Sequence, residues 1–150
     1  AILQHEDGKL QILCRTRQDR IYTAWSEDMG KTWTALVPTS LPNNNSGIDA
    51  VTLEDGRHVL VYNHIDRAAS EDRRNRLHVA ISEDGVNWSA VAALEDDEDT
   101  EHEYSYPAVI QASDGNIHIT YTWRRELIRH VIMDLSEIDP VAITDQTWPL

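Results

Sequence analysis

The basic residues of this chain are almost all arginine, the side chain best suited to binding a carboxylate. Arginine accounts for 11 of the 13 basic residues and lysine for two. The planar guanidinium can donate two parallel hydrogen bonds to one carboxylate, whereas a lysine ammonium acts as a point charge. This ratio is compatible with a site for an acidic ligand, and equally with the compositional bias of the source genome. The positions of the arginines in the fold must decide between these interpretations.

Two short segments carry Ser, Asp and Trp at a spacing that resembles a catalytic arrangement, "SEDMGKTW" from Ser26 and "SEDGVNW" from Ser82. In such a turn the Asp carboxylate can accept hydrogen bonds from the backbone N–H groups of its own turn. The Gly allows a positive φ, and the Trp can pack between sheets. We therefore interpret both segments as structural turns. Their residues are Ser26, Asp28, Gly30, Thr32 and Trp33 in the first, and Ser82, Asp84, Gly85 and Trp88 in the second.

The net charge of the chain limits its partners. The 150 residues carry 26 acidic against 13 basic side chains, a net charge of −13 at pH 7. This charge repels nucleic-acid phosphates and anionic membranes, so we expect no nucleic-acid partner. No apolar run reaches the roughly 18 residues of a membrane span, and the first residues lack the pattern of a signal peptide. The compartment stays open, and nothing calls for a cofactor, a metal or, with Cys14 alone, a disulfide.

Three Asp-Gly pairs, at residues 7–8, 55–56 and 114–115, mark the elements that would position these side chains. Asp-Gly tolerates the positive φ angles of a tight turn, and the flanking runs are rich in Ile, Val, Tyr and Thr. We therefore predict three β-hairpins, each followed by a third strand. The third strands cover residues 20–26, 76–82 and 127–134, and fourth strands in the first two units cover residues 33–37 and 88–93.

Four antiparallel strands per unit, repeated at roughly 40 to 60 residues, predict an all-β fold of propeller blades. The blades would cover residues 1–41, 42–98 and 99–150, as a single partial domain. Three blades cannot close a ring of about four to eight. We expect about half of a six-bladed propeller, completed by further blades or by a second copy. The acidic run "EDDEDTEHE" between the last two units could bind calcium, but a surface linker is favoured.

Strand direction separates the ends of each blade into two rims. The Asp-Gly turns and the two Ser-x-Asp turns would share one end, which we call the box rim. The opposite end, the mouth rim, would carry the connections between second and third strands and the starts of first strands. Its candidate residues are Arg15, residues 43–49 with Asn45 and Asp49, Asn63, His64, Arg74, Tyr104, Trp123 and Arg124. These residues would form a polar opening that bears arginines, where propellers usually bind ligands.

The motif Ser-x-Asp-x-Gly-x-Thr-Trp resembles the Asp box, the repeat of bacterial neuraminidases. The copy at Ser26 matches in full, the copy at Ser82 is one residue shorter, and the third unit has "MDLSEI" in its place. The strings "GKLQILCRTRQDRIYTAWSEDMGKTW", "NNNSGIDAVTLEDGRHVLVYNH" and "YSYPAVIQASDGNIHITYTWRRELIRHVIMD" are similar to the carboxy-terminal half of predicted bacterial neuraminidases. The chain therefore resembles the sialidase superfamily, although Asp boxes also occur in other propellers.

The resemblance implies a site in which three arginines bind the sugar carboxylate, a Tyr paired with a Glu is the nucleophile, and an Asp is the acid/base. Arg15 resembles the second of these arginines and Arg74 the third, although Arg73 and Arg76 leave that register open. Tyr104 resembles the nucleophile, and Tyr106 would share its face through the two-residue period of a strand. Asn45, Asp49, His64 and Arg124 are further candidates for contact with the sugar.

Each of these residues also has a structural interpretation. Arg15 could pair with an acidic neighbour, Arg74 lies in a charged loop, and Tyr104 could pack between blades. His64 fits a hydrogen-bonded structural histidine better than a proton shuttle, and the segment "NNNSG" is first a turn. The first clamp arginine, the acid/base Asp and the Glu that activates the Tyr would lie before Ala1. Glu103 is a poor substitute, because neighbouring strand residues point to opposite faces.

The resemblance implies an exo-acting glycoside hydrolase of sialidase type, which releases a terminal acidic sugar from a glycan. We expect the chain to be inactive by itself. One alternative keeps the propeller but changes the chemistry to a rhamnosidase or polysaccharide lyase, in which His64 and a tyrosine would move protons. Another is a non-catalytic propeller that binds glycans or proteins.

Overall fold

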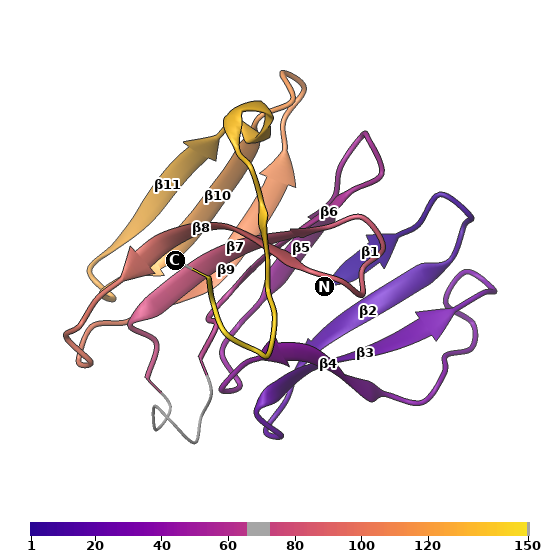
Figure 1. Cartoon of the computed structure of the whole chain (residues 1–150), viewed down its shortest axis with the longest axis horizontal. Helices are drawn as coiled ribbons and strands as arrows, with labels where there is room; N and C mark the ends of the chain where they lie inside the picture. The colour runs from indigo at the N-terminus through magenta and orange to yellow at the C-terminus, as the bar shows by residue number, and fades with distance from the viewer. Residues whose placement is uncertain (66–72, 150) are drawn as a thin grey trace.

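The computed structural model describes residues 1–65 and 73–149, which form three antiparallel sheets placed side by side (Figure 1). The first blade contains β1 (Ile2–Gln4), β2 (Leu10–Arg15), β3 (Arg20–Ser26) and β4 (Val37–Pro42). The middle blade contains β5 (Asp49–Thr52), β6 (His58–Tyr62), β7 (Arg76–Ser82) and β8 (Ser89–Asp96), and the third contains β9 (Tyr104–Gln111), β10 (Ile117–Trp123) and β11 (Leu127–Met133). The predicted all-β, partial propeller fold is confirmed.

The hairpins form where the Asp-Gly pairs predict them. In the first, Gly8 has a φ of 82°, and Asp7 Oδ1 accepts a hydrogen bond from the backbone N–H of Lys9 at 3.0 Å. The pairs at Asp55 and Asp114 repeat this arrangement, with acceptor distances of 3.0 and 3.1 Å. A side chain could adopt this φ only with strain, so the turn chemistry fixes where each hairpin reverses.

Two apolar cores hold the blades together. One lies between the first and middle blades and includes Leu13, Ile21, Leu60 and Trp88. The other lies between the middle and third blades and is built from Leu53, Val59, Val61, Leu77, Val79, Ile81, Tyr104, Val109, Ile117, Ile119 and Tyr121. Alternation along each strand sends every second side chain into one of these cores, which stacks the blades face to face.

The fourth strands differ from the prediction. The first starts at Val37, not at residue 33, and runs to Pro42. The turn at residues 26–33 delays it, because Thr34 still donates its N–H to the carbonyl of Trp25 at 2.9 Å. In the third blade, the chain leaves β11 through a 3₁₀ helix (Leu135–Glu137) and returns to the middle blade. There β12 (Val141–Ala142) pairs with β8 as a fifth strand.

Both rims form as strand direction predicts. In Figure 1 the three Asp-Gly turns lie toward the upper right, at the box rim. The connections at the ends of β2, β8 and β10 lie at the opposite end, the mouth rim. No helix of residues 1–65 or 73–149 is long and apolar enough to cross a membrane.

Candidate functional site

One of the predicted arginines, Arg74, lies beside a tyrosine on the mouth rim, and that tyrosine is Tyr106. Arg15 ends β2, and its Nη1 donates to the carbonyl of Asn45 at 3.5 Å. Arg74 lies just before β7, and its Cζ is 5.5 Å from the centroid of the Tyr106 ring. The Tyr106 side chain is 58% exposed. Gly47 lies against its ring, so that a Cβ at this position would be 3.4 Å from Tyr106 Cδ1.

The charges around Tyr106 favour its phenolate. The pKa of the phenol is lowered from its ordinary value, because the Arg74 guanidinium stabilises the ionised oxygen by hydrogen bonding and by its charge. Arg15 adds a smaller effect of the same sign, and Glu103 opposes it. An exposed phenol whose pKa is lowered by arginines is a more reactive group than an isolated tyrosine.

Tyr104, the predicted nucleophile, is 1% exposed and packs in the core between the middle and third blades. Its hydroxyl donates to Asp97 Oδ2 at 2.8 Å and accepts from Arg124 Nε at 3.2 Å. Burial and the hydrogen bond to Asp97 raise the pKa of this phenol. Because the ring is in the core and the hydroxyl is bonded to Asp97 and Arg124, the geometry favours packing between blades over the predicted role.

The prediction that Tyr104 and Tyr106 share a face is wrong, and a β-bulge is the reason. In the pairing of β9 with β10, Ser105 lies opposite Thr122 and Ala108 opposite Thr120. Two residues of β9 therefore face one of β10, and Tyr106 has a φ of 53°. A bulge interrupts the two-residue alternation and redirects the side chain that follows it.

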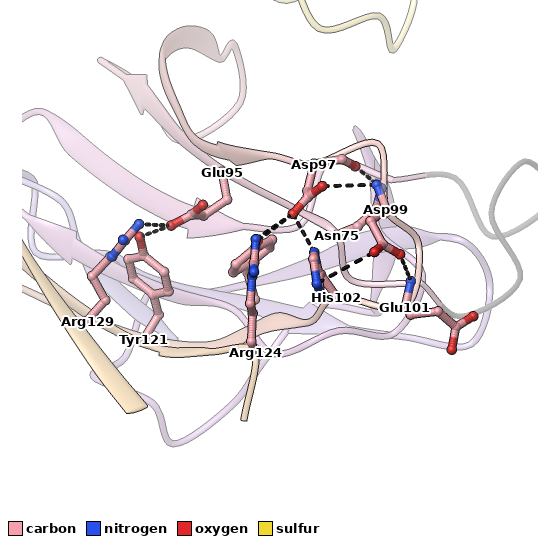
Figure 2. A network of polar contacts seen from close by, with 10 residues as sticks. Asn75, Glu95, Asp97, Asp99, Glu101, His102, Tyr121, Arg124 and Arg129 are labelled. Atoms are coloured by element: carbon pink, nitrogen blue, oxygen red, sulfur yellow. Dashed lines mark hydrogen bonds and ion pairs between the residues drawn. The ribbon is translucent and has the colours of Figure 1, made fainter. Parts of the chain in front are cut away.

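The acidic run after β8 is not a surface linker but part of the joint between blades (Figure 2). Asp97 Oδ2 accepts from His102 Nδ1 at 2.6 Å and from Arg124 Nη2 at 3.2 Å. The backbone N–H of Asp99 and the hydroxyl of Tyr104 also donate to Asp97, and together these bonds hold the pKa of its carboxyl well below the ordinary range. Because these donors use the carboxylate oxygens, the run does not favour the calcium interpretation. Among the described residues, no group of three or more His, Cys, Asp or Glu is arranged to hold a metal ion.

Glu95, in the same run, holds two residues of the third blade. Its Oε1 accepts from the hydroxyl of Tyr121 and from Arg129 Nη1, both at 2.6 Å, as Figure 2 shows. Burial and this hydrogen bond raise the pKa of the Tyr121 phenol. Arg124 and Arg129 both lie over the ring of Trp123, at 4.3 and 5.1 Å from its centroid. Arg124, predicted to contact the sugar, is thus engaged with protein groups.

Comparison with known proteins identifies the family. A family model described as a BNR repeat-like domain matches residues 1–119. The chain belongs to the BNR repeat-like domain family. No curated protein matches this BNR repeat-like domain.

Solved structures of sialidases share the fold of this BNR repeat-like domain. The intramolecular trans-sialidase of Ruminococcus gnavus has a TM-score of 0.73 at 20% identity, over 92% of this chain and 32% of its own. The leech intramolecular trans-sialidase gives 0.71 at 19%, over 91% and 23%. The NanB sialidase of Streptococcus pneumoniae gives 0.70 at 14%, over 93% and 23%. The chain spans a third or less of each of these structures, and the predicted resemblance to sialidases is confirmed in its fold.

Three arginines lie close together in the sequence, Arg73, Arg74 and Arg76. Of these, Arg74 lies beside Tyr106. Arg76 Nε pairs with Asp96 Oδ1 at 2.7 Å, on the exposed end of β7. Arg73 is exposed, and its carbonyl accepts from Asn44 Nδ2 at 2.5 Å. The sequence left open which of these three arginines corresponds to the third clamp arginine. The backbone contacts of this segment favour Arg74 for that position.

The remaining predicted sugar contacts are used within the protein. Asp49 Oδ2 accepts from the backbone N–H of Val109 at 2.9 Å and so joins β5 to β9. His64 is buried, with Tyr62 Oη 2.6 Å from Nδ1 and the carbonyl of Gln146 2.8 Å from Nε2. Its pKa is lowered by burial. These contacts favour the structural interpretation of His64, while Asn45, with a φ of 68°, presents its carbonyl to Arg15.

The "NNNSG" segment is more than a surface turn, since Asn43, Asn44 and Ser46 are buried. Asn43 Nδ2 donates to the carbonyl of Asn63 at 3.3 Å. Asn63 in turn donates to the carbonyl of Tyr104 at 2.9 Å. Buried amides of this kind satisfy backbone carbonyls where three blades meet, so they position the mouth rim and do not face a ligand.

The two Ser-x-Asp turns lie on the box rim, away from Arg15 and Arg74. In the first, Asp28 Oδ1 accepts from the Thr32 N–H at 2.8 Å. In the second, Asp84 Oδ1 accepts from Val86 and Asn87 N–H at 2.8 and 2.7 Å. The two tryptophans differ: Trp88 is 3% exposed in the core, whereas Trp33 is 36% exposed and caps its own turn through Nε1 and the Gly30 carbonyl at 3.1 Å.

The sequence did not predict a functional role for two residues, Glu103 and Arg125. Glu103 had been dismissed because it does not face Tyr104, yet it contacts Arg74, Arg125 and Ser105. Arg125 had not been considered, because nothing in the string "WRRE" distinguishes one arginine from the other. The sequence shows only that polar side chains flank the strand predicted to begin at Tyr104. This pattern does not predict which of those side chains bind one another.

Proposed function

We propose that this chain supplies part of the active site of a sialidase-type exo-glycoside hydrolase, with Tyr106 as the nucleophile. Arg15 and Arg74 would bind the carboxylate of a terminal acidic sugar such as sialic acid. The observation that carries the proposal is the exposed Tyr106 phenol beside the Arg74 guanidinium, whose Cζ is 5.5 Å from the ring centroid. This arrangement supplies both a positive site and a nucleophile within one sugar ring of each other.

The chemistry follows from the charges. The anomeric carbon of sialic acid already bears a carboxylate, so a neutral phenol approaches it with less repulsion than a carboxylate nucleophile would. The two arginines bind the carboxylate and favour the developing phenolate. The phenolic oxygen forms a bond to the anomeric carbon and gives its proton to the Glu that the resemblance pairs with the Tyr, while the glycosidic oxygen leaves with a proton from the acid/base Asp. Water then attacks the anomeric carbon and gives a proton to that Asp, the Tyr–sugar bond breaks, and the phenolic oxygen recovers its proton from the Glu.

The resemblance implies that the acid/base Asp, the Glu that activates the Tyr and one clamp arginine belong to other blades, so the activity is proposed for the whole protein and we expect the chain alone to be inactive. The lyase and rhamnosidase alternatives required His64 to move protons. Both of its ring nitrogens lie at hydrogen-bond distance from Tyr62 and the Gln146 carbonyl, which does not favour that role. A non-catalytic glycan-binding propeller would use the same arginines without turnover.

The test compares two phenols in the full-length protein, with a fluorogenic sialoside as substrate. Tyr106→Phe is expected to lower kcat on the order of 10³-fold or more, as loss of a nucleophile does. The matched control, Tyr104→Phe, should retain turnover close to wild type. Full activity of the Tyr106→Phe variant would refute the assignment. Binding of sialic acid without any hydrolysis by the wild type would favour the non-catalytic propeller.

A further inference from the structure

We propose that Glu103 is a positioning residue that fixes the Arg74 guanidinium for a ligand carboxylate, with Arg125 as its second support. This inference rests on the proposed function and adds a residue to it. Glu103 Oε1 accepts from Arg74 Nη1 at 3.1 Å and from Ser105 Oγ at 2.6 Å. Its Oε2 lies 2.7 Å from Arg125 Nη2. The carboxylate therefore binds donors from two blades and from the turn between β10 and β11.

The backbone holds the same two residues together. Arg74 and Glu103 form a parallel β-bridge, and the N–H of Tyr104 donates to the Arg74 carbonyl at 2.8 Å. The N–H of Arg124 donates to the Glu103 carbonyl at 2.7 Å. Both ends of the ion pair are thus anchored, so the pair loses less conformational entropy than two free surface side chains would.

Arg74 needs such support because of its neighbours. Arg74 lies over the exposed Tyr106 ring at the mouth rim, and Arg15 lowers the pKa of the same phenol by its charge, so both positive charges act in one region of this rim. An unsupported Arg74 would gain rotamer freedom and hydration by turning toward solvent. Glu103 offsets the positive charge from one side and uses one donor of the guanidinium. Arginine has five N–H donors in a fixed fork, so the remaining ones can bind a carboxylate.

Glu103 also remains charged over the working pH range. Its side chain is 19% exposed, and that burial by itself raises the pKa. Hydrogen bonds from Ser105 and Arg125 and the charge of Arg74 outweigh the effect of burial and lower the pKa below its ordinary value. A carboxylate that stays ionised can hold a guanidinium in one orientation at neutral pH.

The test replaces Glu103 by Gln, which keeps the shape and the Ser105 contact but removes the charge. Affinities of the full-length protein for sialic acid and for its methyl ester are compared. The wild type should prefer the acid, and Glu103→Gln should lower this preference about tenfold, the effect of losing a charge-assisted contact. Ser105→Ala, which removes a donor without removing the charge, should leave the preference nearly unchanged.

A second measurement does not need the ligand. Phenylglyoxal modifies free guanidinium groups, and the rate at Arg74 can be followed by peptide mass spectrometry. Glu103→Gln should raise this rate severalfold, while Ser105→Ala should not. In an Arg74→Lys background, Glu103→Gln should have little further effect on the acid preference, because coupled residues are not additive.

The outcomes separate the two proposals. If the wild type prefers the acid and Glu103→Gln keeps that preference, the positioning role of Glu103 is overturned and the proposed function stands. If the wild type binds the acid and its ester equally, the proposed carboxylate site is refuted. The role of Glu103 in positioning Arg74 for a ligand carboxylate is then refuted too, whatever rates of phenylglyoxal modification are measured. If Glu103→Gln loses the preference for the acid but the rate of phenylglyoxal modification at Arg74 stays the same, the positioning role of Glu103 is also contradicted.

Discussion

At the box rim, the carboxylates of Asp28 and Asp84 accept hydrogen bonds from residues no more than four positions away. Both have a pKa lowered to about 2 by these bonds, for Asp84 against the opposing effect of burial. At the mouth rim, Glu103 contacts an arginine 29 positions away, and Glu95 contacts one 34 positions away. The box-rim carboxylates shape their own turns, whereas the mouth-rim carboxylates join blades.

The difference explains where a ligand site can form. In a self-contained turn the carboxylate is used by donors of the turn itself. The mouth rim collects side chains from three blades, so its charges are arranged by the stacking of the sheets. Arg74 from the middle blade lies over Tyr106 from the third, and Arg15 from the first blade acts on the same phenol by its charge, only for this reason.

The largest expected effect breaks a mouth-rim contact between blades. Glu95→Ala leaves the buried Tyr121 hydroxyl without its acceptor, so the free energy of unfolding should fall by about 2 kcal/mol. Urea unfolding measures this change. The double variant Glu95→Ala, Tyr121→Phe should recover much of the loss, since removing both polar partners costs less than orphaning one.

Glu98→Ala is the matched control for this experiment. Glu98 is an exposed acid of the same run, and its removal should change the free energy of unfolding by less than about 0.5 kcal/mol. Equal losses from Glu95→Ala and Glu98→Ala would mean that the run is a surface linker after all.

An intermediate effect tests a long-range contact at the box rim. His5 Nε2 lies 3.0 Å from Gln11 Oε1, and His58 Nε2 lies 3.3 Å from His5 Nδ1. Burial lowers the pKa of His58 from 6.5 to about 4. The unfolded chain takes up this proton near pH 6.5 and the folded chain only near pH 4. The free energy of unfolding should thus fall by about 1 to 2 kcal/mol as the pH falls between these values.

His58→Gln removes this titration while keeping a hydrogen-bonding side chain. The free energy of unfolding of the variant should depend less steeply on pH between 6.5 and 4 than that of the wild type. Identical slopes would show that the joint between the first two blades at the box rim is not sensitive to protonation.

The smallest effect concerns a local turn. Asp84→Ala removes an acceptor from the Val86 and Asn87 N–H groups, and the free energy of unfolding should fall by about 1 kcal/mol, as for a helix N-cap. Because the folded pKa is lowered to about 2, this contribution is present above the ordinary value of 3.8 and is lost as the pH falls toward 2. Thermal and urea unfolding give the change.

The exposed neighbour Glu83, replaced by Ala, serves as the control for Asp84. The preference for sialic acid over its methyl ester should be the same in both variants and the wild type. A change in that preference with Asp84→Ala would place the box rim in ligand binding and erase the contrast between the two rims.

Much of the architecture could be predicted because it is encoded locally. The Asp-Gly pairs, the period of the strands and the Ser-x-Asp turns depend on backbone preferences of a few consecutive residues. Strand direction then assigned Arg15 and Arg74 to one rim. The start of β4 was misplaced because a turn that continues to Thr34 looks in the sequence like the beginning of a strand.

The sequence by itself determined the blades, their rims and the arginine-rich character of the opening. Only the tertiary structure decided which tyrosine lies beside Arg74. A bulge in β9 turns Tyr106 outward and leaves Tyr104 in the core. The backbone preferences of a few consecutive residues do not predict where one of two paired strands has an extra residue. The partner of Arg74 was decided in the same way, because an ion pair across 29 positions exists only once the blades have stacked.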